Sequence, residues 1–257
     1  MRIALCLSGF IGNVNKWISG EEIDYKYGHK YIKQAIMDGY DVDVFIHSWS
    51  TSHQDGIKQL YKPVRSVFEP NKNFKLKGSI SKEKLPTPYS FAVKSMWYSR
   101  QKSIELVKQH ELINNFKYDF VLLTRFDIAL FKKFKFEDYD SSKIYIAGPV
   151  IAAKLRSGKV IPHKINDIYF MSNSENIKKI TKVFDTYEDI ATKQNKDWPF
   201  QSVSSHVIIT KHLDNEGLFE HVETLFERPW QPSMTWEGEI RFLRADPDLK
   251  TIKADEN

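Results

Sequence analysis

The sequence predicts an α/β protein of the Rossmann type, with a mostly parallel central sheet flanked by helices. Three segments favour this class. Residues 2–9 contain an apolar run closed by Ser8-Gly9, which is typical of a strand buried on both faces. Residues 21–37 predict a helix that ends at Gly39, and residues 42–47 predict a second buried strand. Together they form a β-α-β unit, which implies parallel strands.

The composition is that of an ordinary globular protein of 257 residues, 41% of them hydrophobic, with 38 Lys+Arg against 33 Asp+Glu. The single cysteine, Cys6, excludes internal disulfides and paired-cysteine metal or redox motifs. The first apolar run is too short for a membrane span or a signal-peptide core, so we expect a cytoplasmic protein. The net charge of +5 is mild and includes local lysine clusters, which favours an anionic ligand over nucleic acid.

No repeat, low-complexity segment or linker divides the chain. We therefore expect one domain over residues 1–257, with residues 228–257 as an irregular C-terminal tail. Residues 50–89 are rich in proline and predict mostly loop, with one short strand at residues 64–68. Ser90 can cap a helix over residues 91–112, where apolar side chains recur at helical spacing.

Further strands and helices are expected in the second half of the chain. Residues 118–130 predict a strongly apolar strand, and residues 143–147 and 166–171 predict two more. Ser172 and Glu175 match a capping box that starts a helix reaching residue 190. Residues 201–213 predict a helix or a strand.

The most informative segment is residues 118–130, because this apolar strand ends by presenting Arg125 and Asp127. Ligands of open α/β sheets bind at the carboxyl ends of strands. A carboxylate there could hold a divalent cation against a diphosphate, and the guanidinium fork of Arg125 could bind the diphosphate directly. Alternation along the strand puts Arg125 and Asp127 on one face and Phe126 on the other. An ion pair with only a structural role explains the same spacing equally well.

Several common catalytic motifs are missing from the sequence. The first strand is followed by neither the three-glycine dinucleotide fingerprint nor a Walker lysine. There is also no HExxH and no GxSxG motif. The sequence therefore favours neither a Rossmann dehydrogenase nor a P-loop kinase.

Four short segments carry a resemblance to a known family: residues 4–9 (ALCLSG), residues 43–49 (DVFIHSW), residues 95–99 (SMWYS) with Lys102, and residues 124–128 (TRFDI). With the order of elements, they resemble GT-A-fold nucleotide-sugar glycosyltransferases. More narrowly, the chain resembles little-characterised sugar transferases of large DNA viruses and bacterial surface-polysaccharide clusters, over about residues 1–215.

The resemblance implies a GT-A-like fold and the transfer of a sugar from a nucleotide diphosphate donor. Ser8 and Gly9 would lie under the base and ribose of the nucleotide. Asp127 stands where the family's DxD motif has its metal-binding acid, and the metal would be Mn²⁺ or Mg²⁺. Arg125 replaces the first acid of that motif, so either a metal or Arg125 itself would neutralise the diphosphate.

Helical spacing brings Lys94, Tyr98 and Lys102 to one face, where they could close on the donor sugar or its phosphates. A solvated lysine face with a half-buried tyrosine is the simpler alternative. The expected donor-binding residues are Ser8, Gly9, His47, Lys94, Ser95, Tyr98, Lys102, Thr124 and Arg125.

The expected catalytic acids are Asp127 and Asp167. A carboxylate at position 167 could accept the proton of an acceptor hydroxyl, and an Asn-Asp turn that caps a strand is the alternative. His206 interrupts an apolar run and is, with Asp127, an expected metal ligand, although a satisfied buried histidine explains it as well. Because aromatic faces stack on sugars and acids bind hydroxyls, Trp236 and Glu237 are expected to bind the acceptor, together with Asn166 beside Asp167. Tryptophans flanked by prolines that simply anchor the tail are the alternative.

The sequence therefore predicts a glycosyltransferase with a nucleotide-sugar donor and a glycan or glycolipid acceptor. The lysine clusters at residues 72–84 and 154–164 could attract an anionic acceptor or a membrane surface. Two other functions stay open at this stage. One is a non-enzymatic protein that binds nucleic acid or an anionic polymer, although no nucleic-acid module is recognisable; the other is a nucleotidyltransferase.

Overall fold

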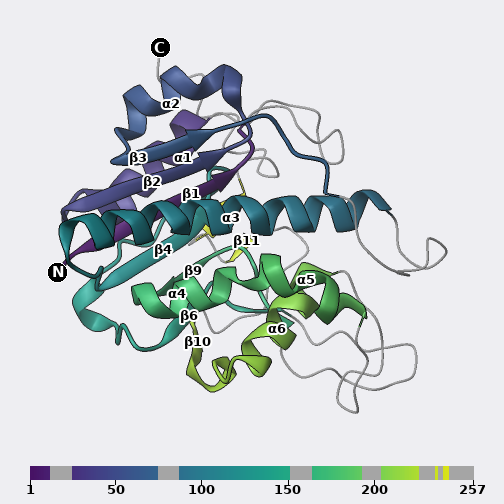
Figure 1. The fold of residues 1–257 in the computed structure, drawn as a ribbon. Helices are drawn as coiled ribbons and strands as arrows, with labels where there is room; N and C mark the ends of the chain where they lie inside the picture. The colour runs from purple at the N-terminus through teal and green to yellow at the C-terminus, as the bar shows by residue number, and fades with distance from the viewer. Residues whose placement is uncertain are drawn as a thin grey trace.

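A computed structural model describes residues 1–11, 25–74, 87–150, 164–192, 204–225, 235–236 and 240–242. Within these residues the chain forms a seven-stranded sheet with the strand order β10-β6-β9-β4-β1-β2-β3 (Figure 1). Its strands are β1 (Ile3–Gly9), β2 (Val42–Ser48), β3 (Arg65–Phe68), β4 (Phe120–Arg125), β6 (Ile144–Ile146), β9 (Phe170–Ser172) and β10 (Val222–Thr224).

The sheet is mostly parallel. Strands β3, β2, β1 and β4 pair in parallel, as do β6 and β10, whereas β9 runs antiparallel to both β4 and β6. The β-α-β start of the chain is present as expected. The predicted Rossmann-type α/β class, with a mostly parallel sheet flanked by helices, is confirmed.

Helices cover both faces of the sheet, and β1 supplies side chains to two separate cores. Ile3, Leu5 and Leu7 pack in one core, while Ala4 and Cys6 pack in the other, as the alternation of a strand requires. The first core includes α1 (Tyr25–Ile32), the π-helical η1 (Lys33–Met37) and α2 (Gln54–Tyr61). The second lies under α3 (Thr87–Asn114), α4 (Ser174–Thr181), α5 (Val183–Thr192) and α6 (Ser205–Asn215), with α3 running across the sheet (Figure 1).

The proline-rich region 50–89 contains more helix than the sequence predicts. A short turn, η2 (Thr51–His53), leads into α2, in which Ile57 and Tyr61 are one turn apart and both buried. Lys62 ends the helix in a left-handed conformation with φ of 44°. The loop prediction is wrong for this segment because a single buried pair at helical spacing is a weak signal beside four prolines.

The predicted strand over residues 118–130 is two strands. β4 ends at Arg125, and after a turn β5 (Ile128–Leu130) pairs with β12 (Ile240–Phe242), which in turn pairs with β11 (Thr235–Trp236). The apolar run is continuous because both strands are buried, although they belong to different sheets. Asp127 consequently lies in the turn between the two strands and not within a strand.

The predicted start of the helix after residue 172 is also wrong. Ser172 is the last residue of β9, where its hydroxyl donates to the Lys143 carbonyl at 2.6 Å. Asn173 caps α4 instead, since its side chain accepts the Asn176 N–H at 2.9 Å. The single expected helix is divided into α4 and α5.

The remaining described elements are short: β7 (Pro149–Val150), β8 (Lys164–Ile165), η3 (Phe136–Asp138) and η4 (Phe219–His221). β7 and β8 pair with each other. In the region where the sequence allows a helix or a strand, α6 is a helix. Among the described residues, no helix is long and apolar enough to cross a membrane.

The cap of α4 gives a test of the fold at one residue. Replacing Asn173 by Ala removes the acceptor of the Asn176 N–H, and we expect the free energy of unfolding to fall by about 1 kcal/mol. Glu175→Ala is the control, because Glu175 is exposed and its pairs with Lys117 and Lys178 are surface pairs worth less than about 1 kcal/mol. Urea denaturation measures both. A larger loss for Glu175→Ala than for Asn173→Ala would contradict the observed cap.

Candidate active site at the carboxyl edge of the sheet

The candidate site lies where the order of strands reverses. From β1 the sheet continues on one side to β2 and β3 and on the other side to β4. Ser8 of β1 is directly opposite Arg125 of β4, so the carboxyl ends of the two central strands meet. Ligands of open α/β sheets bind at such a switch point.

The backbone at the end of β1 is held by hydrogen bonds from three elements. The Gly9 N–H donates to Ser99 Oγ of α3 at 2.9 Å, and its carbonyl accepts from Ser48 Oγ at 2.8 Å. Gly9 has φ of 105°, a conformation that favours glycine. Ser8 is buried and donates to the Thr124 carbonyl at 3.3 Å. The two residues expected under the nucleotide therefore have a fixed backbone path.

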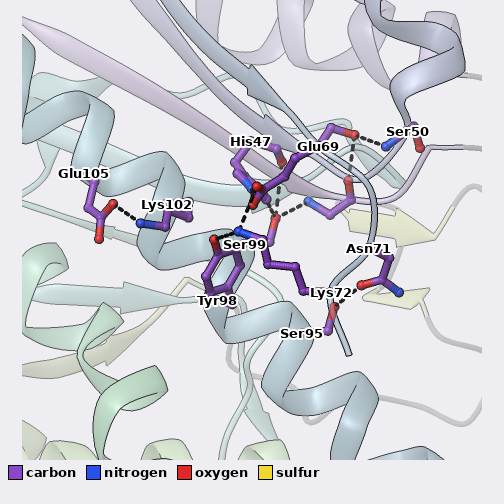
Figure 2. A network of polar contacts seen from close by, with 12 residues as sticks. His47, Ser50, Glu69, Asn71, Lys72, Ser95, Tyr98, Ser99, Lys102 and Glu105 are labelled. Carbon is purple, nitrogen blue, oxygen red and sulfur yellow. Dashed lines mark hydrogen bonds and ion pairs between the residues drawn. The ribbon is translucent and has the colours of Figure 1, made fainter. Parts of the chain in front are cut away.

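His47 is the centre of a polar network that joins β2 to α3 and to the segment after β3 (Figure 2). Its side chain is fully buried, with Nδ1 2.8 Å from Ser99 Oγ and Nε2 3.1 Å from Glu69 Oε1. Burial lowers the pKa of His47 below its ordinary value, although the hydrogen bond and the charge of Glu69 act in the opposite direction. The neutral imidazole therefore fixes Ser99, and through it Gly9.

Tyr98 brings together aromatic and basic groups on the same side of the network. Its ring stacks on Trp49 with centroids 5.4 Å apart. Lys72 donates to the Tyr98 hydroxyl and pairs with Glu69 at 2.8 Å, while Lys102 Nζ lies 5.5 Å from the Tyr98 ring (Figure 2). Tyr98 and Lys102 thus lie together as helical spacing predicts.

The other residues expected on this helix face have partners of their own. Lys94 pairs with Glu188 of α5, and its Nζ lies 5.8 Å from the Phe184 ring. Ser95 Oγ donates to Asn71 Oδ1 at 3.2 Å. Lys102 also pairs with Glu105 at 2.6 Å. Lys94 is therefore engaged with α5, while Ser95 contacts the segment that follows β3.

Arg125 and Asp127 form a two-point ion pair across the turn after β4. Arg125 Nε donates to Asp127 Oδ1 at 2.7 Å and Nη2 donates to Oδ2 at 2.6 Å. The Asp127 side chain is 3% exposed, whereas that of Arg125 is 23% exposed, so the guanidinium is the more accessible partner. Although burial works against the charged form, the Asp127 carboxylate raises the pKa of Arg125. Phe126 packs in the core on the opposite face, as alternation predicts.

Asp167 lies close to this pair because β9 is antiparallel to β4. Phe170 at the start of β9 is opposite Leu123, so the residues that precede β9 reach the carboxyl edge. Asn166 Oδ1 accepts the Ile168 N–H at 3.0 Å, which forms the turn that is the structural alternative for this segment. Asp167 Oδ1 is 3.4 Å from His206 Nδ1, and His206 and Arg100 lower the pKa of Asp167 although burial raises it.

Some expected site residues are less informative. Thr124 is buried, and its hydroxyl has no hydrogen-bond partner within the described residues. Trp236 lies in β11, and Glu237 lies outside the described residues.

The expected metal can be compared with the donors that are present. Both carboxylate oxygens of Asp127 accept hydrogen bonds from Arg125, and His206 contacts Asp167 and the Ile165 carbonyl. Among the described residues, no three His, Cys, Asp or Glu side chains are grouped so as to hold a metal ion. The described side chains do not fit a preformed site for Mn²⁺ or Mg²⁺ in this conformation.

The sequence assigns no individual role to three residues of this edge, Glu69, Ser99 and Arg100. Ser99 and Arg100 lie in a segment whose pattern indicates an ordinary helix, and Glu69 lies in a segment predicted as loop. Lys72 was predicted only as part of the lysine cluster at residues 72–84. A buried position for Ser99 could have been inferred from its one-turn spacing to Ser95 and Ser103, but nothing local identifies its partner His47.

Comparisons with known proteins supply no argument for the function. No family model and no curated protein matches the chain. Among solved structures, the chain is similar to the CTP:phosphocholine cytidylyltransferase LicC of Streptococcus pneumoniae, with a TM-score of 0.46 and 13% sequence identity, over 100% of this chain and 99% of that chain. The function has to be argued from the residues at the edge of the sheet.

The buried His47 predicts a pH dependence of stability. Because its pKa is lower in the folded chain, the unfolded chain binds the proton more readily, and stability should fall as the pH drops below about 6.5. We expect His47→Gln to flatten the dependence of unfolding free energy on pH between about pH 7 and pH 5. The exposed His221, replaced by Gln, is the control. An identical slope for wild type and His47→Gln would contradict this account.

Proposed function

We propose that the chain is a glycosyltransferase that uses a nucleotide diphosphate sugar as donor and a glycan or glycolipid as acceptor. One observation carries the proposal: a buried acid paired with a partly exposed arginine at the carboxyl ends of β1 and β4, where the strand order reverses. The resemblance of residues 124–128 to the acid motif of GT-A transferases adds support.

The fixed backbone at Ser8 and Gly9 suits the nucleotide end of the donor. Its N–H and carbonyl groups are already satisfied by Ser99 and Ser48, so the strand end is preorganised and needs no rearrangement on binding. In this proposal the base and ribose lie over Ser8 and Gly9, and Tyr98 and Lys102 approach the donor from α3.

The departing nucleoside diphosphate develops negative charge, which fixed positive groups stabilise most when they are preorganised. Asp127 holds the guanidinium of Arg125 at two points and so sets its orientation at the edge of the sheet. In this proposal Arg125 supplies positive charge to the leaving group and Asp127 orients it.

In this proposal Asp167 acts on the acceptor. Its ionised carboxylate lies at the same edge, and its low pKa, which results from His206 and Arg100 in spite of burial, keeps it charged at neutral pH. We assign Asp167 the role of the base that accepts the proton of the attacking hydroxyl. Asn166, which fixes the turn, positions the segment on the acceptor side. Mn²⁺ or Mg²⁺ has no assigned step, because the described donors form no preformed site.

Asp127→Asn tests the proposal directly. The variant keeps the shape of the side chain but removes its charge, and we expect donor hydrolysis and sugar transfer to fall by about 10²–10³-fold. Asp138→Asn, at an exposed position in η3, is the matched control. The assay follows release of nucleoside diphosphate from common nucleotide sugars. Unchanged turnover would remove Asp127 from the mechanism, and release of pyrophosphate from nucleoside triphosphates would identify a nucleotidyltransferase instead.

A further inference from the structure

Arg100 of α3 is a fully buried guanidinium that the sequence gives no reason to notice. Its Nη2 donates to the Asp167 carbonyl, but Nε and Nη1 have no hydrogen-bond partner within the described part of the chain. A buried cationic group with unpaired donors is costly to a fold, and such groups call for an explanation.

The position of Arg100 is well defined despite its missing partners. The guanidinium carbon lies 4.7 Å from the Trp97 ring and 5.8 Å from the Phe170 ring, and the bond to the Asp167 carbonyl fixes one end of the fork. These contacts hold the group rigidly, so its two spare donors are preorganised.

The charges around Arg100 belong to the candidate active site. The guanidinium interacts electrostatically with Asp167, Arg125 and Asp127, and burial lowers its pKa to about 10, which leaves it charged at neutral pH. This set contains two guanidinium groups and two carboxylates, so only the two guanidinium groups of the set attract an anion.

The two arginines differ in what they can still donate. Arg125 already gives Nε and Nη2 to Asp127, so this edge of its guanidinium, which makes a two-point bond, is occupied. Arg100 has two donors in reserve. An anion gains most from the donors that break no existing bond.

We propose that Arg100 is a ligand-binding residue, and that its Nε and Nη1, whose N–H groups point in different directions, donate to two separate oxygens of a diphosphate ligand at the β1–β4 switch point. This inference rests on the proposed function and makes it more specific: Arg100 makes the direct contact with the phosphate, while Arg125, held by Asp127, contributes positive charge without a direct bond. Because the guanidinium is covered in the unliganded chain, binding includes a local rearrangement that uncovers it.

The test is calorimetric titration of inorganic pyrophosphate into the full chain, in buffer containing EDTA. Arg100→Lys keeps the charge, but a single ammonium nitrogen on a shorter stem cannot occupy the Nη2, Nε and Nη1 positions at once, so we expect affinity to fall roughly tenfold or more. Arg125→Lys should change affinity by less than about threefold. Arg65→Lys, the same change on the edge strand β3, should leave the affinity unaltered.

Arg100→Met is a second variant. Thermal unfolding of each variant identifies any that fails to fold. If Arg100→Met fails to fold, the affinity of Arg100→Lys decides the test. Wild-type affinity in the Arg100 variants, or a larger loss for Arg125→Lys than for Arg100→Lys, would overturn the inference alone. A wild-type chain that binds neither pyrophosphate nor any nucleoside diphosphate would overturn the proposed function with it. A crystal structure of the complex in which Nε and Nη1 contact only water or protein would also refute the assignment.

Discussion

The parallel pairing of β1 with β4 is the constraint on which the site depends. Its register puts Ser8 opposite Arg125, so the end of one strand and the start of the acidic turn cannot move independently. A shift of one residue would turn every side chain of a strand to the opposite core, and both cores of this sheet are apolar. The hydrophobic packing of the strand interiors therefore sets the positions of polar groups at their ends.

The helix α3 connects the two halves of this edge. Ser99 bonds to the end of β1 and to His47, and the next residue, Arg100, bonds to the segment before β9. One rigid element thus holds the side expected to receive the nucleotide and the side expected to receive the acceptor. Polar groups buried in this way rigidify a site when their partners are present, and they cost stability when partners are missing. The unpaired donors of Arg100 are the one place on α3 where that cost is visible among the described residues.

Much of the fold could be predicted because apolar runs and their spacing report burial directly. The strands near residues 3–9 and 42–48 and the long helix α3 are of this kind. The division of residues 118–130 could not be predicted, since both strands are buried and the turn between them contains the equally buried Phe126. Likewise, Ser172 satisfies a capping pattern locally but is used by the sheet, a choice that depends on Lys143 far along the chain.

The candidate site shows the same limit. Arg125 and Asp127 are two residues apart, so the sequence alone indicates that they can pair, although Asp127 lies in the turn after β4 and not in the strand. Glu69, Ser99 and Arg100 act through partners 22, 52 and 67 residues away, and no local pattern contains that information. Residues of this type become visible only when the register of the strands and the packing of α3 are known.

The central claim is that a nucleoside diphosphate binds at the β1–β4 switch point, and a thermal-shift series tests it most directly. The chain is heated with UDP, GDP, CDP or ADP, each in EDTA and again with Mn²⁺, because a ligand of the folded state raises its melting temperature. We predict that one nucleotide raises the melting temperature by at least about 3 °C in EDTA, because the charge of the arginines is sufficient for binding without a metal. We also predict that Asp127→Ala reduces this rise. No rise with any nucleotide under either condition would contradict the account.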